Sequence, residues 1–152
     1  MVVLAIVSWP ALRTADDAAV VPERELGLLR GARMFRPLSM CTIEELAGHT
    51  RRQTVDAGET LIRKGELGDA FYIIESGVME AIVDGDTVRP MGPGDSFGEI
   101  ALLRNVPRTA TVRATERATL MVLAREPFLA AVAGRREAAA AAEEVIRGRL
   151  GM

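Results

Sequence analysis

The segment FGEIALLRNVPRTATVRA, residues 97–114, interrupts a part of the sequence that is otherwise rich in strand-forming residues. Residues 100–103 are continuously apolar and follow Gly98 and Glu99, so they lack the alternation of a half-buried strand. Strand-forming residues resume after Arg108. The segment therefore predicts a short helix followed by a strand, set inside a β domain.

The polar residues of this segment predict a ligand with one phosphate and one sugar. Free amide groups at the start of a helix favour an anion, and Gly98 lets the backbone approach that anion closely. The guanidinium of Arg108 can donate to two phosphate oxygens at once. Glu99 only accepts hydrogen bonds, so it needs a donor such as a ribose hydroxyl. Because we assign only Arg108 to the phosphate and the sequence has no GK[ST] motif, we expect a single phosphate.

The surrounding sequence, residues 54–124, consists of short β-rich runs separated by glycine-containing turns. Asp84-Gly85 predicts a tight type I′ hairpin, and Pro93-Gly94 predicts a type II turn. Short strands at this spacing favour an antiparallel sandwich or barrel of the jelly-roll kind.

Helical patterns flank the β region. Helices are expected near residues 23–31 and 42–49, with a capping box formed by Thr42 and Glu45 and an extended stretch, MFRPL, between the helices. From residue 126 the chain is rich in alanine and predicts a helix that is interrupted at Gly134. The expected fold is mainly β with flanking helices: a jelly-roll barrel with N-terminal helices, a short phosphate-binding helix and a C-terminal helix. We assign residues 14–33 to a linker and helix and residues 34–152 to the domain.

Residues 1–13 are an apolar segment that ends at Arg13. It is too short to span a bilayer, which takes about 20 apolar residues, and it lacks the pattern of a signal peptide. We interpret it as the end of a transmembrane helix, with Trp9 at the interface and Arg13 on the cytoplasmic side. The alternative is a short element packed on the core. This interpretation predicts a cytoplasmic domain tethered to the inner face of the membrane.

Composition argues against several classes of function. The 152 residues carry a net charge of −2 and no basic block, so a nucleic-acid surface is not expected. Cys41 is the only cysteine, which excludes an intramolecular disulfide, and His49, the only histidine, lies in a polar stretch typical of a surface. No nucleophile, base and orienting group assemble in the sequence, and no metal ligands converge, so we expect neither an enzyme nor a metal site.

Two stretches, residues 97–114 and GETLIRKGELGDAFYIIESG at residues 58–77, resemble the cyclic nucleotide-binding domains. The resemblance covers residues 34–133. It implies that Glu99 binds the ribose 2′-hydroxyl and that Arg108 binds the cyclic phosphate. It also implies that the ligand contacts a further set of residues: Gly98, Ile100, Ala101, Thr109, Ala110 and, on the base side, Met91. In this family the hydroxyl at the position of Thr109 contacts the phosphate or assists guanine recognition, which leaves cAMP and cGMP open. We favour cAMP on family grounds.

Three alternatives stay open at this point. The last helix lacks the aromatic residue that often closes the base pocket, so it is either a plain amphipathic cap, which we favour, or a lid. The candidate lid residues are Arg135, Arg136, Val145, Ile146 and Leu150. Glu99 and Arg108 can also form a structural ion pair in a degenerate member that binds no ligand.

The expected role is regulatory. Only residues 151 and 152 follow the last helix, which leaves no room for a helix-turn-helix. The N-terminal junction resembles that of bacterial membrane transporters of the major facilitator type, or of a channel, that carry such a domain. We therefore expect a cyclic nucleotide sensor linked to, or associated with, a membrane transport protein. The sequence leaves the oligomeric state open.

Overall fold

The structure, a computed structural model, describes residues 23–151. The apolar segment of residues 1–13 therefore lies outside the described residues, and its interpretation stays a prediction. Within the described residues no helix is both long and apolar enough to cross a membrane. The helices are α2 (Glu23–Gly31), the 3₁₀ helix η1 (Arg33–Phe35), α3 (Met40–Gly48), α4 (Glu99–Leu103), α5 (Arg125–Val132) and α6 (Arg136–Leu150).

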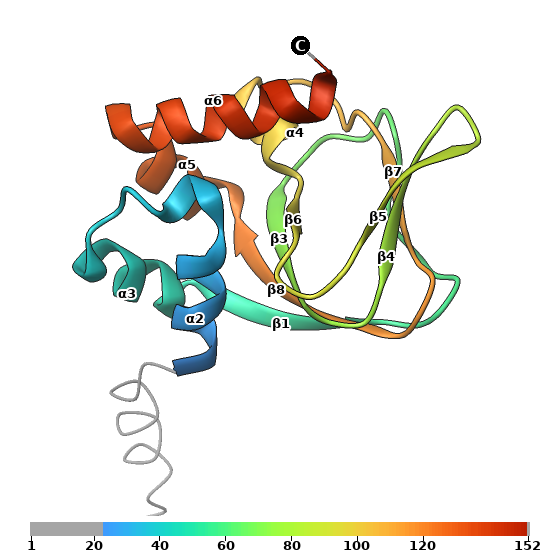
Figure 1. The fold of residues 1–152 in the computed structure, drawn as a ribbon, viewed down its shortest axis with the longest axis horizontal. Coiled ribbons are helices and arrows are strands. Elements are labelled where there is room, and N and C mark those ends of the chain that lie inside the picture. The colour runs from blue at the N-terminus through green and yellow to red at the C-terminus, as the bar shows by residue number, and fades with distance from the viewer. Residues whose placement is uncertain (1–22, 152) are drawn as a thin grey trace, which may run out of the picture.

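Eight strands form two antiparallel sheets that face each other beside a layer of helices (Figure 1). One sheet has the order β1-β8-β3-β6 and the other has the order β2-β7-β4-β5. The strands are β1 (Thr50–Val55), β2 (Thr60–Ile62), β3 (Ala70–Ser76), β4 (Met79–Val83), β5 (Asp86–Met91), β6 (Ser96–Phe97), β7 (Thr111–Ala114) and β8 (Ala118–Ala124). The predicted fold class, mainly β with flanking helices, is confirmed. The two sheets form a sandwich of the jelly-roll kind, the open form of the sandwich or barrel that the strand spacing predicted.

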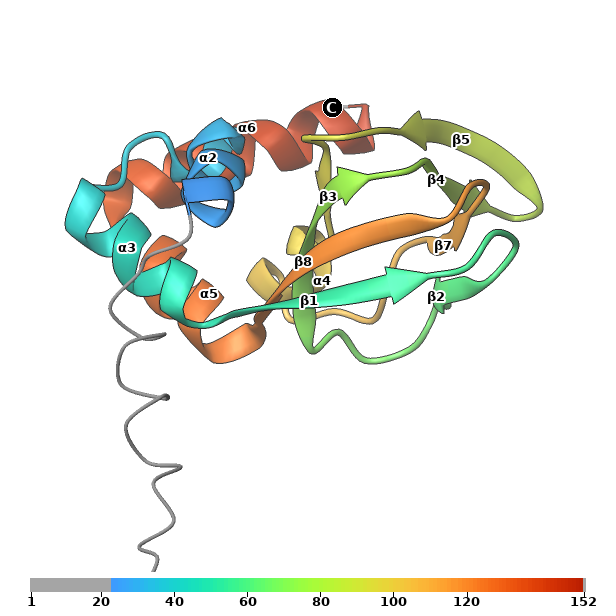
Figure 2. The same cartoon turned by 90° about the horizontal axis from the view of Figure 1, so that it is seen from below.

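The central strands β3 and β8 are buried on both faces because successive side chains of a strand point in opposite directions. Tyr72 and Ile74 lie in the cluster between the two sheets, while Phe71 and Ile73 lie in the cluster under the helices. The same alternation divides the side chains of β8. The first sheet therefore supports two separate cores. Figure 2 shows the helices on one side of this sheet and the second sheet on the other.

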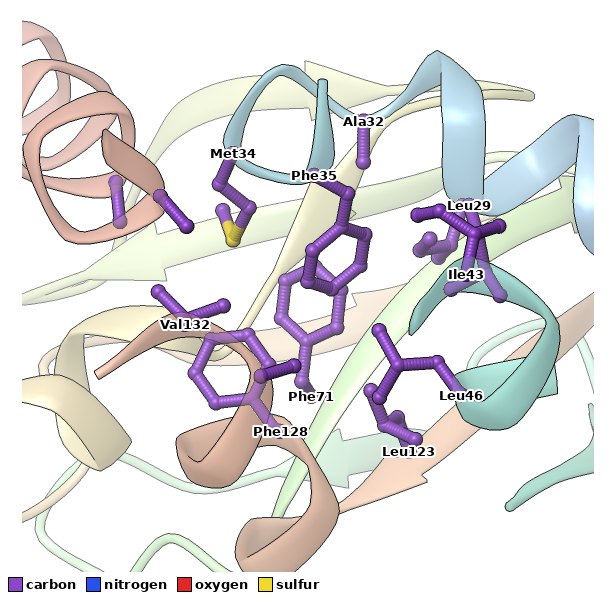
Figure 3. Packing of buried hydrophobic residues seen from close by; sticks show 14 of the residues in the cluster. Leu29, Ala32, Met34, Phe35, Ile43, Leu46, Phe71, Leu123, Phe128 and Val132 are labelled. Atoms are coloured by element: carbon purple, nitrogen blue, oxygen red, sulfur yellow. The ribbon is translucent and has the colours of Figure 1, made fainter. Parts of the chain in front are cut away.

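The helical core centres on three phenylalanines (Figure 3). Phe71 and Phe128 stack with ring centroids 4.8 Å apart, and Phe35 meets Phe71 edge-on at 5.5 Å. Leu29 and Leu46 close this core from α2 and α3. The N-terminal helices are thus fixed to the sheet by apolar packing rather than carried as a loose extension.

The turn predictions are confirmed, and two details of the N-terminal helices are corrected. Asp84 and Gly85 both have positive φ, 52° and 86°, as a type I′ turn requires, and they join β4 to β5. The stretch between α2 and α3, expected to be extended, contains η1, because burial of Met34 and Phe35 in the helical core overrides local preference. The cap of α3 is Ser39, whose hydroxyl accepts from the Thr42 amide, and Thr42 is not the cap.

The C-terminal segment is broken near Gly134, as predicted, into α5 and α6. Helix α6 crosses the top of the molecule in Figure 1, where it packs on η1, α5 and α4. An ion pair between Arg104 of the α4 C-cap and Glu143 of α6, 2.6 Å apart, joins these two helices. This placement brings the last turn of α6 into contact with Ser96 and Glu99, at the end of β6 and the start of α4.

Candidate functional site

The short helix α4 begins where the sequence predicts it, between β6 and β7. Gly98 is its N-cap and has a φ of 97°, which an L side chain rarely adopts. A Cβ at this position would lie 2.9 Å from the carbonyl oxygen of Ala70 and 2.9 Å from Nη1 of Arg108. Gly98 is thus required both by the left-handed turn and by the close approach of an arginine.

Arg108 is buried and held by the main chain. Its Nη1 donates to the carbonyl oxygen of Gly98 at 3.0 Å, and its Nη2 donates to that of Ala70 at 2.8 Å. The guanidinium carbon lies 5.9 Å from the ring centroid of Tyr72, and Asp69 is 3.9 Å from Nη2. Burial lowers the pKa of Arg108, while the nearby Tyr72 and Asp69 act in the opposite direction. An arginine has so high an ordinary pKa that it stays a cation at neutral pH, so the site contains a fixed, partly desolvated positive charge.

Glu99, the first residue of α4, is fully buried and carries the opposite charge. Its Oε1 accepts from Nη1 of Arg149, in the last turn of α6, and Nη2 of the same arginine donates to the carbonyl oxygen of Ser96. The second carboxylate oxygen, Oε2, is buried and has no hydrogen-bond partner among the residues described. A buried acceptor without a partner is unfavourable, so this atom is suited to receive a donor from a ligand.

A cavity of about 870 Å³ joins these groups. It is lined by all eight residues that the sequence analysis selected: Met91, Gly98, Glu99, Ile100, Ala101, Arg108, Thr109 and Ala110. Their individual roles as ligand contacts stay predictions, but the fold brings them to one place. The cavity combines a buried cation, a carboxylate with a free acceptor and apolar walls, a composition that suits a small anionic ligand with a hydroxyl donor.

The last turns of α6 form one wall of this cavity, through residues that include Val145, Arg149 and Leu150. Of the lid residues named from the sequence, Val145 and Leu150 therefore lie at the site. Ile146 does not line the cavity because it is fully buried in the protein interior. Arg135 lies elsewhere and donates to the carbonyl oxygens of Ala130 and Ala131.

The alternative of a structural ion pair between Glu99 and Arg108 is wrong, because these two side chains do not pair with each other. Glu99 pairs with Arg149, and Arg108 is satisfied by two carbonyl oxygens. The two charged groups line the same cavity but have separate supports. Each can therefore meet a different part of one ligand.

Sequence reasoning missed three arginines that line the cavity, Arg33, Arg89 and Arg149. The buried residues of α6 lie on one side of the helix: Ala138, Ala142 and Ile146. Arg149 lies one turn after Ile146 on the same side, so this helical spacing could have indicated that Arg149 faces the protein. Arg89 is two residues from Met91 on β5, and residues at that spacing share one face of a strand. Arg89 lines the cavity, and burial, followed by the charge of Arg149, lowers its pKa.

Within residues 23–151 no group of three or more His, Cys, Asp or Glu side chains is placed to hold a metal ion. Arginines outnumber carboxylates among the charged side chains that line the cavity, which favours an organic anion over a cation; these side chains are Arg33, Arg89, Arg108, Arg149, Asp95, Glu99 and Glu144.

Comparison with known proteins finds similarity to regulatory subunits of the cAMP-dependent protein kinase. The regulatory subunit of the cAMP-dependent protein kinase from Yarrowia lipolytica is 53% identical over 73 residues, which are 48% of this chain and 20% of that protein. The corresponding subunit from Blastocladiella emersonii is 39% identical over 100 residues, 62% of this chain and 25% of that protein. The matched part is thus a quarter or less of the length of these curated relatives.

Solved structures show the same fold. A co-crystal structure of the regulatory domain of Toxoplasma gondii PKA with cAMP matches with a TM-score of 0.68 and 34% identity, over 72% of this chain and 43% of that chain. The regulatory subunit of a cAMP-independent protein kinase A from Trypanosoma brucei matches with a TM-score of 0.71 and 22% identity, over 86% of this chain and 46% of that chain. The second likeness supports the fold alone.

The match to the family itself is direct. The family described as the cyclic nucleotide-binding domain matches residues 52–135, more than half of the chain. This region runs from β1 to the residue before α6 and contains the whole of α4 together with Glu99 and Arg108. With the sandwich fold and the cavity, the match confirms the resemblance seen in the sequence: the chain belongs to the cyclic nucleotide-binding domain family.

Proposed function

We propose that this domain binds a cyclic nucleotide, with cAMP as the first candidate, and that it regulates an attached or associated effector. The observation that carries the proposal is the pair of charged groups in one cavity. Glu99 has a buried oxygen without a partner, and Arg108 is a buried cation held in place by the backbone. A cyclic nucleotide offers a ribose hydroxyl to the first and a negatively charged phosphate to the second.

Each group has bonding capacity left for the ligand. A guanidinium has five N–H donors, and Arg108 uses two of them on carbonyl oxygens. The others can donate to the phosphate, together with backbone amides near Ile100 and Ala101. The hydroxyl of Thr109 adds a further donor beside the phosphate. Glu99 then accepts from the ribose through Oε2.

The choice of base rests on two different observations. The relatives reported above include cAMP-dependent regulatory subunits and a regulatory domain crystallised with cAMP, which favours cAMP. Arg89 favours cGMP as the second candidate, because a guanidinium only donates and guanine presents two acceptors, N7 and O6, where adenine presents one acceptor and one donor. A direct comparison of the two nucleotides decides between them.

The signal is proposed to leave the site through α6. This helix forms a wall of the cavity and packs on η1, which leads back to α2 at the N-terminal side of the domain. The effector is either a membrane transport protein joined through residues 1–22, as the sequence suggests, or a protein kinase, as the relatives suggest. The domain has no catalytic role in this proposal.

Thermal unfolding with cAMP, cGMP and 5′-AMP tests the proposal. A ligand that binds only the folded state stabilises it by about 2.7 kcal/mol when its concentration is about 100 times Kd. We expect the midpoint to rise with cAMP or cGMP and to stay unchanged with 5′-AMP, which carries an open phosphate. If millimolar cyclic nucleotide leaves the midpoint in place, the domain is a structural or assembly module that kept the fold without the ligand.

A further inference from the structure

Arg125, the first residue of α5, joins the loop between β2 and β3 to the loop that carries Arg108. Its Nη1 donates to the carbonyl oxygen of Gly68 at 3.3 Å, and its Nη2 donates to Oδ1 of Asn105 at 2.7 Å. We propose that Arg125 is a positioning residue, which fixes the guanidinium of Arg108 by holding these two loops together. We call its contacts with Gly68 and Asn105 the loop clamp. The inference rests on the proposed function, because Arg108 is the residue that we assign to the phosphate.

The first loop, residues 63–69, packs directly on Arg108. The backbone amide of Arg108 donates to the carbonyl oxygen of Glu66 at 2.7 Å, and the carbonyl oxygen of Arg108 accepts from the Gly65 amide at 2.8 Å. A Cβ on Gly68 would lie 3.2 Å from Cζ of Arg108. The guanidinium of Arg108 therefore lies beside the residue whose carbonyl oxygen accepts from Arg125.

The second loop, residues 104–110, follows α4 and contains Arg108 itself. Asn105 in this loop has a positive φ of 50°, in the left-handed region that asparagine adopts more readily than most residues. The side chain of Asn105 accepts from Arg125. The loop clamp thus holds the residue whose left-handed backbone directs the chain from the end of α4 toward Arg108.

Arg125 can act on the ligand only through other residues, because it does not line the cavity. None of the ion pairs among residues 23–151 includes it, and its guanidinium donates to a neutral carbonyl and a neutral amide. Its backbone amide adds a third bond, to the carbonyl oxygen of Asp69 at 2.9 Å. Asp69 precedes Ala70, whose carbonyl oxygen accepts from Nη2 of Arg108. All three bonds of Arg125 thus support the surroundings of Arg108.

The clamp matters because Arg108 is held by two segments of the chain. One carbonyl partner, Gly98, lies at the start of α4, and the other, Ala70, lies at the start of β3. Helix α4 leads into the second clamped loop, and the first clamped loop leads into β3. A guanidinium contacts two phosphate oxygens well only in a fixed orientation. Release of the clamp should therefore weaken the phosphate contact and leave the contact of Glu99 with the ribose intact.

A double-mutant cycle between Arg125 and Arg108 tests the proposal. Calorimetry with cAMP, or with cGMP if the parent binds it more tightly, is performed on the parent, Arg125→Gln, Arg108→Lys and the double variant. We expect Arg125→Gln alone to weaken binding about tenfold. With Lys at position 108 the same change should cost less than about threefold, because the two residues act through one contact.

The 2′-deoxy form of the same nucleotide gives a readout that general loosening of the cavity would move. Loss of the 2′-hydroxyl removes the contact that we assign to Glu99, which the clamp does not support. We therefore expect this loss to weaken binding by the same factor in the parent and in Arg125→Gln. Urea denaturation of both proteins checks that the variant is folded at the temperature of the binding experiment.

Three variants separate the clamp from its charge. Arg125→Lys keeps the charge but offers one nitrogen, so it should recover only part of the lost affinity. Asn105→Gly keeps the left-handed backbone and removes only the acceptor Oδ1, so it should weaken binding about threefold. The matched control is Arg63→Gln: Arg63 is an exposed arginine beside the same loop contacts, does not line the cavity, and should be replaceable without loss of affinity.

The results distinguish failure of the positioning role from failure of the proposed function. If the parent binds neither nucleotide, both fail. If the parent binds but Arg125→Gln or Arg125→Lys binds equally tightly, or if Arg125→Gln costs the same factor with Lys at position 108, only the positioning role is overturned. A changed 2′-deoxy factor in Arg125→Gln would overturn it as well. If Arg125→Gln does not fold, Asn105→Gly carries the test, and an affinity equal to that of the parent refutes the clamp.

Discussion

Replacement of Arg108 by lysine tests whether the guanidinium both stabilises the fold and binds the phosphate. In the structure its two terminal nitrogens donate to the carbonyl oxygens of Gly98 and Ala70, and we propose that its remaining donors bind the phosphate. A lysine keeps the charge but offers one nitrogen. It cannot reach both carbonyl oxygens and the phosphate together.

The expected magnitude follows from these contacts. One buried carbonyl oxygen left without a donor costs about 1–3 kcal/mol of folding free energy. Loss of one charged hydrogen bond to the phosphate weakens binding by about 1.5–3 kcal/mol, which is roughly a 10- to 150-fold rise in Kd. Arg108→Lys should therefore lower both stability and affinity, although the net charge of the domain is unchanged.

Urea denaturation measures the first effect, and calorimetry with cAMP, or with cGMP if that is the preferred nucleotide, measures the second. The control is Arg104→Lys. This arginine is partly exposed, pairs with Glu143 and does not line the cavity, so we expect changes below about 1 kcal/mol in stability and none in affinity. An Arg108→Lys domain that binds as tightly as the parent would show that the guanidinium fork is not part of the phosphate site.

Three further substitutions test the turn before α4, the helical core and an ion pair in the second sheet. Gly98→Ala forces a left-handed φ of 97° on an L residue, so urea denaturation should show a loss of at least about 1–2 kcal/mol. Phe128→Ala removes a fully buried ring stacked on Phe71, and the same assay should show a loss of about 3–5 kcal/mol. Hydrogen bonding by Arg113 lowers the pKa of the Glu80 carboxylate in the folded state. The pair therefore stabilises the fold above the pKa of this group in the unfolded state, about 4.3. This stabilisation is lost as the pH falls through the lower pKa of the folded state. Glu80→Gln should therefore flatten the acid limb of a stability–pH curve, and a curve unchanged by the substitution would contradict this.

Local sequence patterns were sufficient for much of the fold and for the centre of the site. The Asp84-Gly85 turn requires positive φ at both positions, which few sequences other than this type of pair provide, so the hairpin could be predicted from two residues. Glu99 and Arg108 could be predicted to share one site because an acceptor and a cation lie on one short segment, and both line the cavity. Their roles as ligand contacts stay predictions. In each case the signal lies within a few consecutive residues.

The features that the sequence did not predict have a different origin. They depend on contacts between distant parts of the chain. Arg149 meets Glu99 from 50 residues away, and nothing local to either residue indicates the pair. The two carbonyl partners of Arg108 depend on the packing of β3 against α4. The 3₁₀ turn at Met34 forms because tertiary burial outweighs the extended preference of the residue before Pro37 and of its neighbours.

The two cores on opposite faces of the first sheet suggest that the domain opens in two stages. One buried cluster belongs to the helices and the other to the sandwich, so the helical part can unfold transiently while the strands stay paired. The cavity draws its wall from both clusters, with Ala32 and Met34 from the first and Met91 and Val112 from the second. A molecule bound there would stabilise only the fully assembled state, and it would merge two independent opening events into a single cooperative one.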